Sequence, residues 1–466
     1  MTDGATGAVI DAPDTSGSGK KVRTMRIPRR MRNLELALLI IVWLISASAL
    51  VLVQLGSLGT IDPTFMTFSA GLCALTLAMH IVMRFVAPEA DPFILPIATL
   101  LNGIGIAGIY RVDIAEADTG WDAVAVRQMM WTAIAIGCAV TVLLLVRNHR
   151  ILQRYTYIAM FVGVLLLLLP MLPGLGQQIN GARVWISFAG FTFQPGEVAK
   201  IALAVFFAGY LVTRRDSLAI VGKKFMGMQL PRGRDLGPIV VIWLLAMSVI
   251  VFQRDLGTAL LYFGLFLVMI YVATGRFSWV AIGLTLFAGG ALVASQTLDY
   301  VNGRMMNWLD AFNPDIYGAQ GGSYQLVQGL FGLANGGIFG TGLGQGRPDL
   351  TPVAQSDYII ASLGEELGIT GIFCILALYL LFVSRGLRIG FAGQDDFGKL
   401  LAVGLAFVIA LQCFIVIGGV TRVIPLTGLT TPFLAAGGSA LIANWIIAAL
   451  LLRVSDSVRT QPRIVV

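Results

Sequence analysis

Apolar runs of eighteen or more residues recur along this chain, and each is long enough to cross the ~30 Å hydrocarbon core of a membrane. A backbone in lipid has to satisfy its own hydrogen bonds, so these runs are expected to form helices. Only 12% of the 466 residues are charged, about half of the ~25% found in soluble domains. The sequence therefore predicts an all-α polytopic membrane protein. The twelve expected spans lie near residues 34–56, 64–87, 93–110, 125–146, 155–173, 198–213, 237–252, 257–274, 278–296, 367–384, 398–419 and 434–452.

The distribution of Lys and Arg indicates how these spans are oriented. When the N-terminus is placed in the cytoplasm and the sides alternate, about three quarters of the 32 Lys and Arg residues fall in cytoplasmic segments. This is the asymmetry that the positive-inside rule describes. We therefore expect both termini in the cytoplasm, with residues 1–33 as a disordered basic tail and 456–466 as a second tail. The polar stretches 174–197, 297–360 and 420–433 then share the opposite face.

This topology disfavours several kinds of site. The Gly-rich stretch GIFGTGLGQGRPD is not a Walker pattern, and it lies on a face that has no supply of ATP. The two histidines, His80 and His149, are far apart in sequence, and the four cysteines lie in apolar segments without metal-ligand spacing. The sequence thus requires no cofactor, and we expect no nucleic-acid partner.

Ionisable residues at membrane depth are costly, which makes them candidates for a functional site. Each group alone could instead be a structural ion pair or a helix cap. Convergence of all of them at the outer end of the bundle favours a site, because Arg and Lys can hold an anionic diphosphate. The groups are Glu197 with Lys200, which are spaced to pair on one helix face, Arg254 with Asp255, Glu365 with Glu366, and Arg422.

The outer stretch 297–360 carries candidates of its own. Loops longer than about 15 residues are usually functional or disordered. Within this one, the apolar spacing of YQLVQGLFGLANGG predicts a short helix, either on the bilayer surface or packed on the bundle. The polar residues Asp310, Asp315 and Gln325 lie before or at the start of that helix. Asp315 is a candidate general base, and the NPD sequence around it is equally good turn chemistry.

Six motifs in a fixed order resemble the SEDS family of polytopic peptidoglycan glycosyltransferases, which includes RodA and FtsW. They extend from about residue 97 to 455 and are more similar to the elongation-type, RodA-like members. The resemblance implies a SEDS-type ten-helix core over residues 93–455, with an extracytoplasmic catalytic loop at 297–360. Residues 34–92 would then be two additional N-terminal helices. The motifs are GIGIAGIYRVD, INGARVWISFAGFTFQPGEVAK, FQRDLGTAL, NPDIYGAQGGSYQLVQG, SDYIIASLGEELGITG and RVIPLTGLTTPFLAAGGSA.

The resemblance also implies an activity. SEDS enzymes polymerise lipid II, a disaccharide-pentapeptide on undecaprenyl diphosphate, at the outer face of the bacterial cytoplasmic membrane during elongation and shape maintenance. An aspartate base would activate the acceptor hydroxyl, whose attack inverts the donor's anomeric carbon and expels the lipid diphosphate. The matching position is Asp315, and Asp310 is a competitor because a proline precedes Asp315 instead of following it. The residues expected to line or support the substrate cavity are Trp185, Glu197, Lys200, Arg254, Asp255, Arg304, Gln325, Asp357, Glu365, Glu366 and Arg422.

Partners and one alternative follow from the same resemblance. A class B penicillin-binding protein transpeptidase is the expected partner, and a Mg²⁺ or Mn²⁺ ion bridging carboxylate and diphosphate oxygens is compatible with the chemistry. The stretch FLAAGGSA stands where the family usually shows SYGGSS, which removes a Ser and a Tyr hydroxyl. The alternative function is a lipid II flippase. A transporter should carry its charges near the bilayer midplane, whereas here they are expected at the outer ends of the spans.

Overall fold

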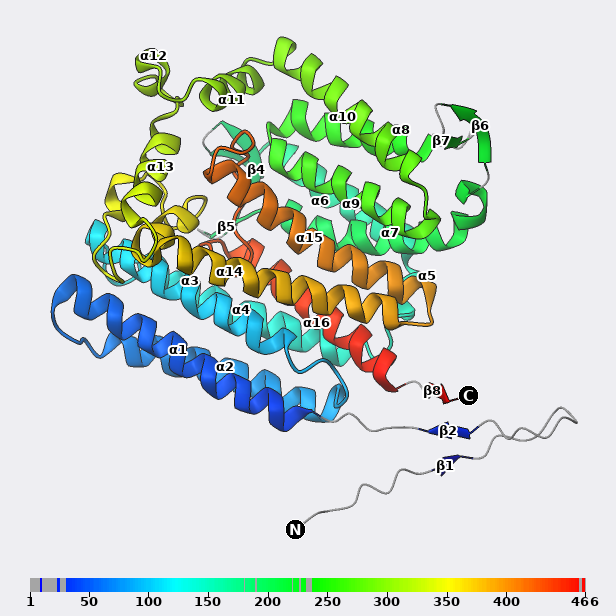
Figure 1. Cartoon of the computed structure of the whole chain (residues 1–466), viewed down its shortest axis with the longest axis horizontal. Helices are drawn as coiled ribbons and strands as arrows, with labels where there is room; N and C mark the ends of the chain where they lie inside the picture. Colours follow the sequence, from blue (N-terminus) through cyan, green and yellow to red (C-terminus); the bar gives the residue numbers. More distant parts are fainter. Residues whose placement is uncertain are drawn as a thin grey trace, which may run out of the picture.

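The computed structural model describes a bundle of helices that run side by side (Figure 1). The described residues are 9–10, 23–25, 31–179, 181–188, 191–219, 221–225, 228–231, 237–460 and 463–465. Most of the tail predicted at residues 1–33 lies outside them. The α-helices are α1 (Arg32–Leu58), α2 (Thr64–Val86), α3 (Ile94–Glu116), α4 (Val124–Leu145), α5 (Ile151–Arg154), α6 (Thr156–Leu168), α7 (Pro195–Ala219), α8 (Gly237–Ser248), α9 (Leu256–Thr274), α10 (Phe277–Thr297), α11 (Asp299–Leu309), α12 (Pro314–Tyr317), α13 (Tyr324–Gly336), α14 (Ile359–Ala392), α15 (Asp396–Val420) and α16 (Gly438–Thr460).

Ten of the described helices are long and apolar enough to cross a membrane. The fold class is therefore a polytopic helical membrane protein, as predicted. Two of the expected spans are shorter than the others in the structure. Helix α6 is extended by a 3₁₀ turn at Leu169–Met171, and α8 continues into a π turn at Val249–Gln253. The count of twelve spans therefore stays a prediction.

Short strands lie at the ends of the helices. Strands β3, β4 and β5 form an antiparallel sheet just before α7, where the sequence predicted only a polar stretch. A hairpin of β6 and β7 connects α7 to the α8 region, and β2 pairs with β8 near the two chain ends. The strands are β1 (Val9–Ile10), β2 (Arg23–Met25), β3 (Gly176–Ile179), β4 (Ala182–Phe188), β5 (Phe191–Phe193), β6 (Val221–Phe225), β7 (Met228–Pro231) and β8 (Arg463–Val465).

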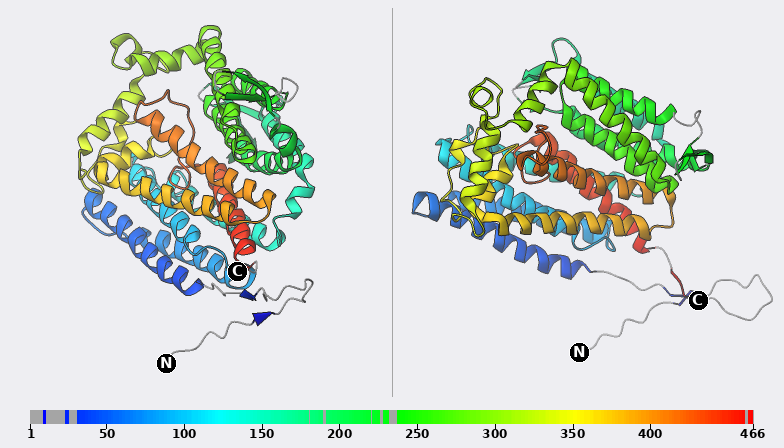
Figure 2. Two further views of the ribbon diagram at one scale, coloured as in Figure 1. Left: turned by 45° about the vertical axis from the view of Figure 1, so that its right-hand side comes forward. Right: turned by 45° about the horizontal axis from the view of Figure 1, so that its top comes forward.

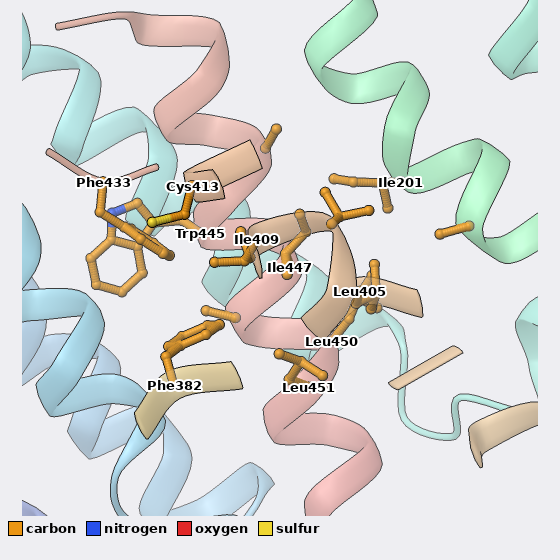
Figure 3. Close-up of a cluster of buried hydrophobic side chains, with 14 of the residues drawn as sticks. Ile201, Phe382, Leu405, Ile409, Cys413, Phe433, Trp445, Ile447, Leu450 and Leu451 are labelled. Carbon is orange, nitrogen blue, oxygen red and sulfur yellow. The ribbon is translucent and has the colours of Figure 1, made fainter. Parts of the chain in front are cut away.

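The core of the bundle forms where α14, α15 and α16 meet (Figure 3). Phe433 packs edge-on against Trp445, with their ring centroids 5.9 Å apart, and tilts against Phe382 at 5.8 Å. Ile409 and Cys413 of α15 lie beside them and are almost completely buried. Helices in lipid associate mainly through close packing of this kind, so these three helices form a rigid centre.

Helices α11, α12 and α13 form an arm at the end of the bundle opposite β2 and β8 (Figures 1 and 2). They occupy less than half of the stretch 297–360, and turns connect them to one another and to α14. Helix α13 confirms the helix predicted from the apolar spacing, and it packs on α14. The residues of the predicted apolar spacing differ in exposure. Val327 is buried as expected, whereas Phe331 is 54% exposed. Gly329 faces Tyr358, where an added β-carbon would lie 2.6 Å from the ring, so this glycine permits a close approach of α13 to the start of α14.

Helix α14 is kinked at Gly368, whose φ of 68° and ψ of −175° are not helical. The predicted span began at 367, which coincides with the kink, and the structure adds a preceding helical segment from Ile359. A kink in lipid leaves backbone groups without helical partners. Here Ile369 N and Thr370 N donate to the carbonyls of Gly337 and Ile338, at 2.9 and 3.1 Å. The turn after α13 thus completes the hydrogen bonding of α14.

Candidate functional site

A buried ion pair lies in the first turns of α7. Lys200 Nζ lies 2.6 Å from Glu197 Oε2, and the Lys200 side chain is only 1% exposed. The same ammonium donates to Gln412 Oε1 at 2.8 Å and to Asn444 Oδ1 at 3.2 Å. An ammonium has three hydrogens, and here each has an acceptor. The spacing therefore predicted the pair correctly, but not the two amide partners on α15 and α16.

Asp255 caps the N-terminus of α9 close to that pair. Its carboxylate accepts a hydrogen bond from Thr258 N at 2.9 Å and another from the Thr258 hydroxyl. Burial raises the pKa of Asp255, the positive charge of Arg304 lowers it, and Glu197 raises it further. Tyr262 of α9 donates to Gly196 O at 2.7 Å, which holds the starts of α7 and α9 together. Asp255 is thus both a helix cap and a charge beside Glu197.

Asp357 and Arg304 complete this charged cluster. Burial raises the pKa of Asp357 to about 6, although the Ser356 hydroxyl and Arg304 both favour its ionised form. Asp255 adds a repulsive charge to Asp357. Arg304, on α11, is half-buried and donates to Leu426 O at 3.1 Å. Arg304 is therefore the cation that acts on both carboxylates.

Two further arginines contact the arm of α11, α12 and α13. The Arg254 backbone has a φ of 57°, and its guanidinium lies 5.9 Å from the centre of the Tyr300 ring. Arg422 donates to the carbonyls of Trp308 and Leu309, each at 2.7 Å. These are the last residues of α11, where a cation is favoured by the helix dipole. Arg422 therefore acts first as a clasp on the end of α11.

Asp310 and Asp315 lie just beyond this clasp, and both are exposed. Asn313 connects them, because its amide nitrogen donates to Asp310 Oδ2 at 2.9 Å and its amide oxygen accepts from Asp315 N at 3.0 Å. The NPD sequence therefore forms the turn that its composition favours. Within the described part of the chain, no group donates a hydrogen bond to the Asp315 carboxylate. That carboxylate is free to act as an acceptor.

Glu365 and Glu366 form a separate group on α14. Glu366 accepts from Arg111 Nε at 2.9 Å and from Gly344 N at 3.0 Å, while Glu365 accepts from Asn335 Nδ2 at 3.0 Å. Both carboxylates are buried and bind the turn that follows α13. The predicted convergence of all the ionisable groups is therefore incomplete, because these two serve the turn. Arg111 is a partner that sequence analysis missed, although it stands in the motif GIYRVD.

The last two candidates lie on β4 and α13. Trp185, on β4, is half-buried and pairs in register with Gln177 of β3. Gln325, in the first turn of α13, donates to Pro352 O at 2.7 Å. Neither residue contacts the cluster of Asp255, Arg304 and Asp357 through a hydrogen bond. The described residues also contain no group of three or more His, Cys, Asp or Glu side chains that could hold a metal ion.

Comparison with known proteins places this geometry in a family. Residues 91–460 match the cell cycle protein family of FtsW, RodA and SpoVE. The chain is 46% identical over 450 residues to the peptidoglycan glycosyltransferase RodA of Mycobacterium bovis, and the alignment covers 94% of each chain. It is 33% identical over 374 residues to stage V sporulation protein E of Bacillus subtilis, covering 78% of this chain and 96% of that protein.

Solved structures share the same fold. Rod shape determining protein RodA of Thermus thermophilus aligns with a TM-score of 0.56 at 23% identity, over 80% of this chain and 98% of that one. A chain from a peptidoglycan synthase complex, described as coordinating polymerization and crosslinking, aligns with a TM-score of 0.60 at 23% identity, over 79% of this chain and 98% of that one. The resemblance seen in the motifs is thus confirmed, and the chain belongs to the FtsW/RodA/SpoVE family of cell cycle proteins.

Proposed function

We propose that this membrane protein is a peptidoglycan glycosyltransferase that polymerises lipid II into glycan strands during cell elongation and shape maintenance. The observation that carries the proposal is the position of Arg304. This arginine, on the helix that leads directly to Asp310 and Asp315, favours the ionised form of both Asp255 and Asp357. Four of its relatives, all mycobacterial, carry the name peptidoglycan glycosyltransferase RodA at 46% identity.

The reaction needs a base and a cation, and this arrangement supplies both. Asp315 takes the proton of the acceptor sugar's 4-hydroxyl, whose oxygen attacks the donor's anomeric carbon with inversion. The bond from that carbon to the lipid diphosphate breaks, and the diphosphate leaves with the electron pair. Arg304 and Arg254 stabilise the negative charge of this leaving group. No nucleotide is required because the donor is already activated.

Asp357 adjusts the charge of the same site. Its pKa is raised to about 6 by burial, so it takes up a proton more readily than an exposed aspartate. A protonated Asp357 does not repel the diphosphate, whereas an ionised one does. A Mg²⁺ or Mn²⁺ ion, if bound here, would be held by such a carboxylate and would neutralise negative charge on the diphosphate. Since the described residues offer no ready set of three ligands, we assign no step to a metal.

The proposal includes an orientation and a partner. Both termini face the cytoplasm of a bacterial cell, and α11, α12 and α13 face outward, where lipid II is polymerised. The basis is the excess of Lys and Arg on the side of the termini. The protein works with a class B penicillin-binding protein that crosslinks the new strands. This partner is supported by the similar fold of a chain from a peptidoglycan synthase complex, which is described as coordinating polymerization and crosslinking.

The test uses purified protein with and without its class B partner, given lipid II with Mg²⁺ or Mn²⁺, and measures glycan length on a gel. Wild type should make glycan and Asp315→Asn should not. Asp349→Asn serves as a control because the exposed Asp349 carboxylate pairs with its near neighbour Arg347, at 3.0 Å. Loss in Asp310→Asn alone would move the base to that residue. If neither wild type nor any variant polymerises lipid II, even with the partner present, a lipid II translocation assay would test the flippase alternative.

A further inference from the structure

We infer that the C-terminal end of α1 positions the turn of residues 337–347, and through it the arm that carries the proposed base. This assigns a role to the N-terminal helices α1 and α2, which lie outside the region matched by the family, residues 91–460. The inference rests on the proposed function, because it concerns the placement of Asp310 and Asp315. It makes Gly56 and Gln345 positioning residues, not catalytic ones.

The contact between α1 and the turn is a backbone contact that requires glycine on both sides. A β-carbon at Gly56 would overlap the carbonyl oxygen of Leu343. A β-carbon at Gly344, whose φ is 86°, would lie 2.7 Å from Val53 O and 2.8 Å from the Gly56 Cα. Gln345 Nε2 also donates to Gly56 O at 2.6 Å. The end of α1 therefore fits against this turn with no space between the two backbones.

The opposite side of the turn is bound by α14 and α3. Glu366 accepts from the amides of Gly344 and Gly346 at 3.0 and 3.3 Å, and Arg111 donates to Gly346 O at 2.6 Å. Thr341 N and Gly342 N donate to the carbonyls of Glu365 and Glu366, each at 3.0 Å. The turn is thus held between the family core on one side and α1 on the other.

Helix α1 is itself fixed at both ends, so it can act as a rigid support. Near its outer end, the fully buried Gln54 donates to the Tyr110 hydroxyl at 3.0 Å and accepts from Asp62 N at 3.1 Å. At its other end, Glu35 is bound by Arg32 at 2.7 Å and by His80 at 2.6 Å, and all three side chains are buried. Such buried polar networks fix one arrangement because every partner is needed.

The turn is linked to the aspartates through α13. The turn carbonyls of Gly337 and Ile338 accept hydrogen bonds from the backbone at the kink of α14. Asn335, near the end of α13, donates to Glu365. At the other end of α13, Ser323 Oγ donates to Ala311 O at 2.5 Å. Ala311 directly follows Asp310. A displacement of the turn would therefore be passed along α13 to the segment that holds the proposed base.

The experiment compares Gly56→Leu with Gly137→Leu in the full-length protein together with its class B partner. Gly137 is a matched control because it is an exposed helical glycine of α4 with no atom within 4 Å of an added β-carbon. We expect Gly56→Leu to lower kcat for lipid II polymerisation by roughly tenfold or more, since a misplacement of about 1 Å can cost ~10²-fold. KM should change little. Hydrogen exchange should speed up in residues 337–347 but not in α15 or α16.

Gln345→Ala keeps the test decisive if Gly56→Leu does not fold. It removes one hydrogen bond without a clash and should lower kcat severalfold, with the same local increase in exchange. Unchanged exchange at 337–347, or faster exchange with normal kcat, would overturn the inference while the proposed function stands. If wild type and Gly137→Leu make no glycan, the proposed function itself fails and the inference about catalysis fails with it.

Discussion

Replacing Lys200 by Met should strongly destabilise the fold, because it would leave a buried carboxylate without its cation. The Glu197 and Lys200 side chains are 4% and 1% exposed, and their charged atoms lie 2.6 Å apart. Removing one partner of such a pair costs about 3–5 kcal/mol. The loss would also leave the Gln412 and Asn444 oxygens without this donor.

The double variant Lys200→Met with Glu197→Gln separates a coupled pair from two independent effects. Because it removes both charges, it should be more stable than the sum of the single variants predicts, by about 1–3 kcal/mol. Unfolding in detergent micelles with increasing SDS, followed by circular dichroism, measures all four members of the cycle. Strictly additive single variants would refute the reasoning.

A matched control is available on the surface of the same helix. Arg215 pairs with Asp396 at 3.2 Å, and both side chains are about half exposed, at 51% and 55%. Exposed pairs of this kind contribute about 0–1 kcal/mol. Arg215→Met should therefore leave the unfolding transition nearly unchanged. A loss equal to that of Lys200→Met would show that burial is not the cause.

Two further predictions concern Asp357 and Arg422, at the end of the bundle that carries α11, α12 and α13. The pKa of Asp357 is raised to about 6, so this carboxyl is uncharged below that pH and ionised above it. Binding of a lipid-linked diphosphate should therefore weaken as the pH rises through about 6, and titration of Asp357→Asn should show no such step. Replacing Arg422 by Gln removes its two 2.7 Å hydrogen bonds to Trp308 and Leu309. Hydrogen exchange at the end of α11 should then speed up, and polymerisation should slow. An unchanged polymerisation rate would show that Arg422 does not position the arm.

The sequence alone determined the fold class, because each helix in lipid has to satisfy its backbone within one contiguous apolar run. It also determined the pairing of Glu197 with Lys200, since residues three apart share a helix face. The helix α13 was predicted for the same reason. All three conclusions depend on local spacing, which a single sequence displays directly.

Only the tertiary structure decided which distant residues meet. Glu366 binds Arg111, 255 residues away, and Lys200 binds Asn444, 244 residues away. No local pattern encodes such pairs, because they depend on how whole helices pack. For the same reason Glu365 and Glu366 proved to hold a turn instead of joining Asp255 and Asp357.

The contact of Gly56 with Gly344 shows the same limit most clearly. In the sequence, Gly56 lies in an apolar stretch and Gly344 in a Gly-rich one, and nothing distinguishes either from the neighbouring glycines. In the structure they meet because α1 packs along α3 and ends against the turn that follows α13. The sequence thus determined that α1 spans the membrane, and only the packing of whole helices decided what its end supports.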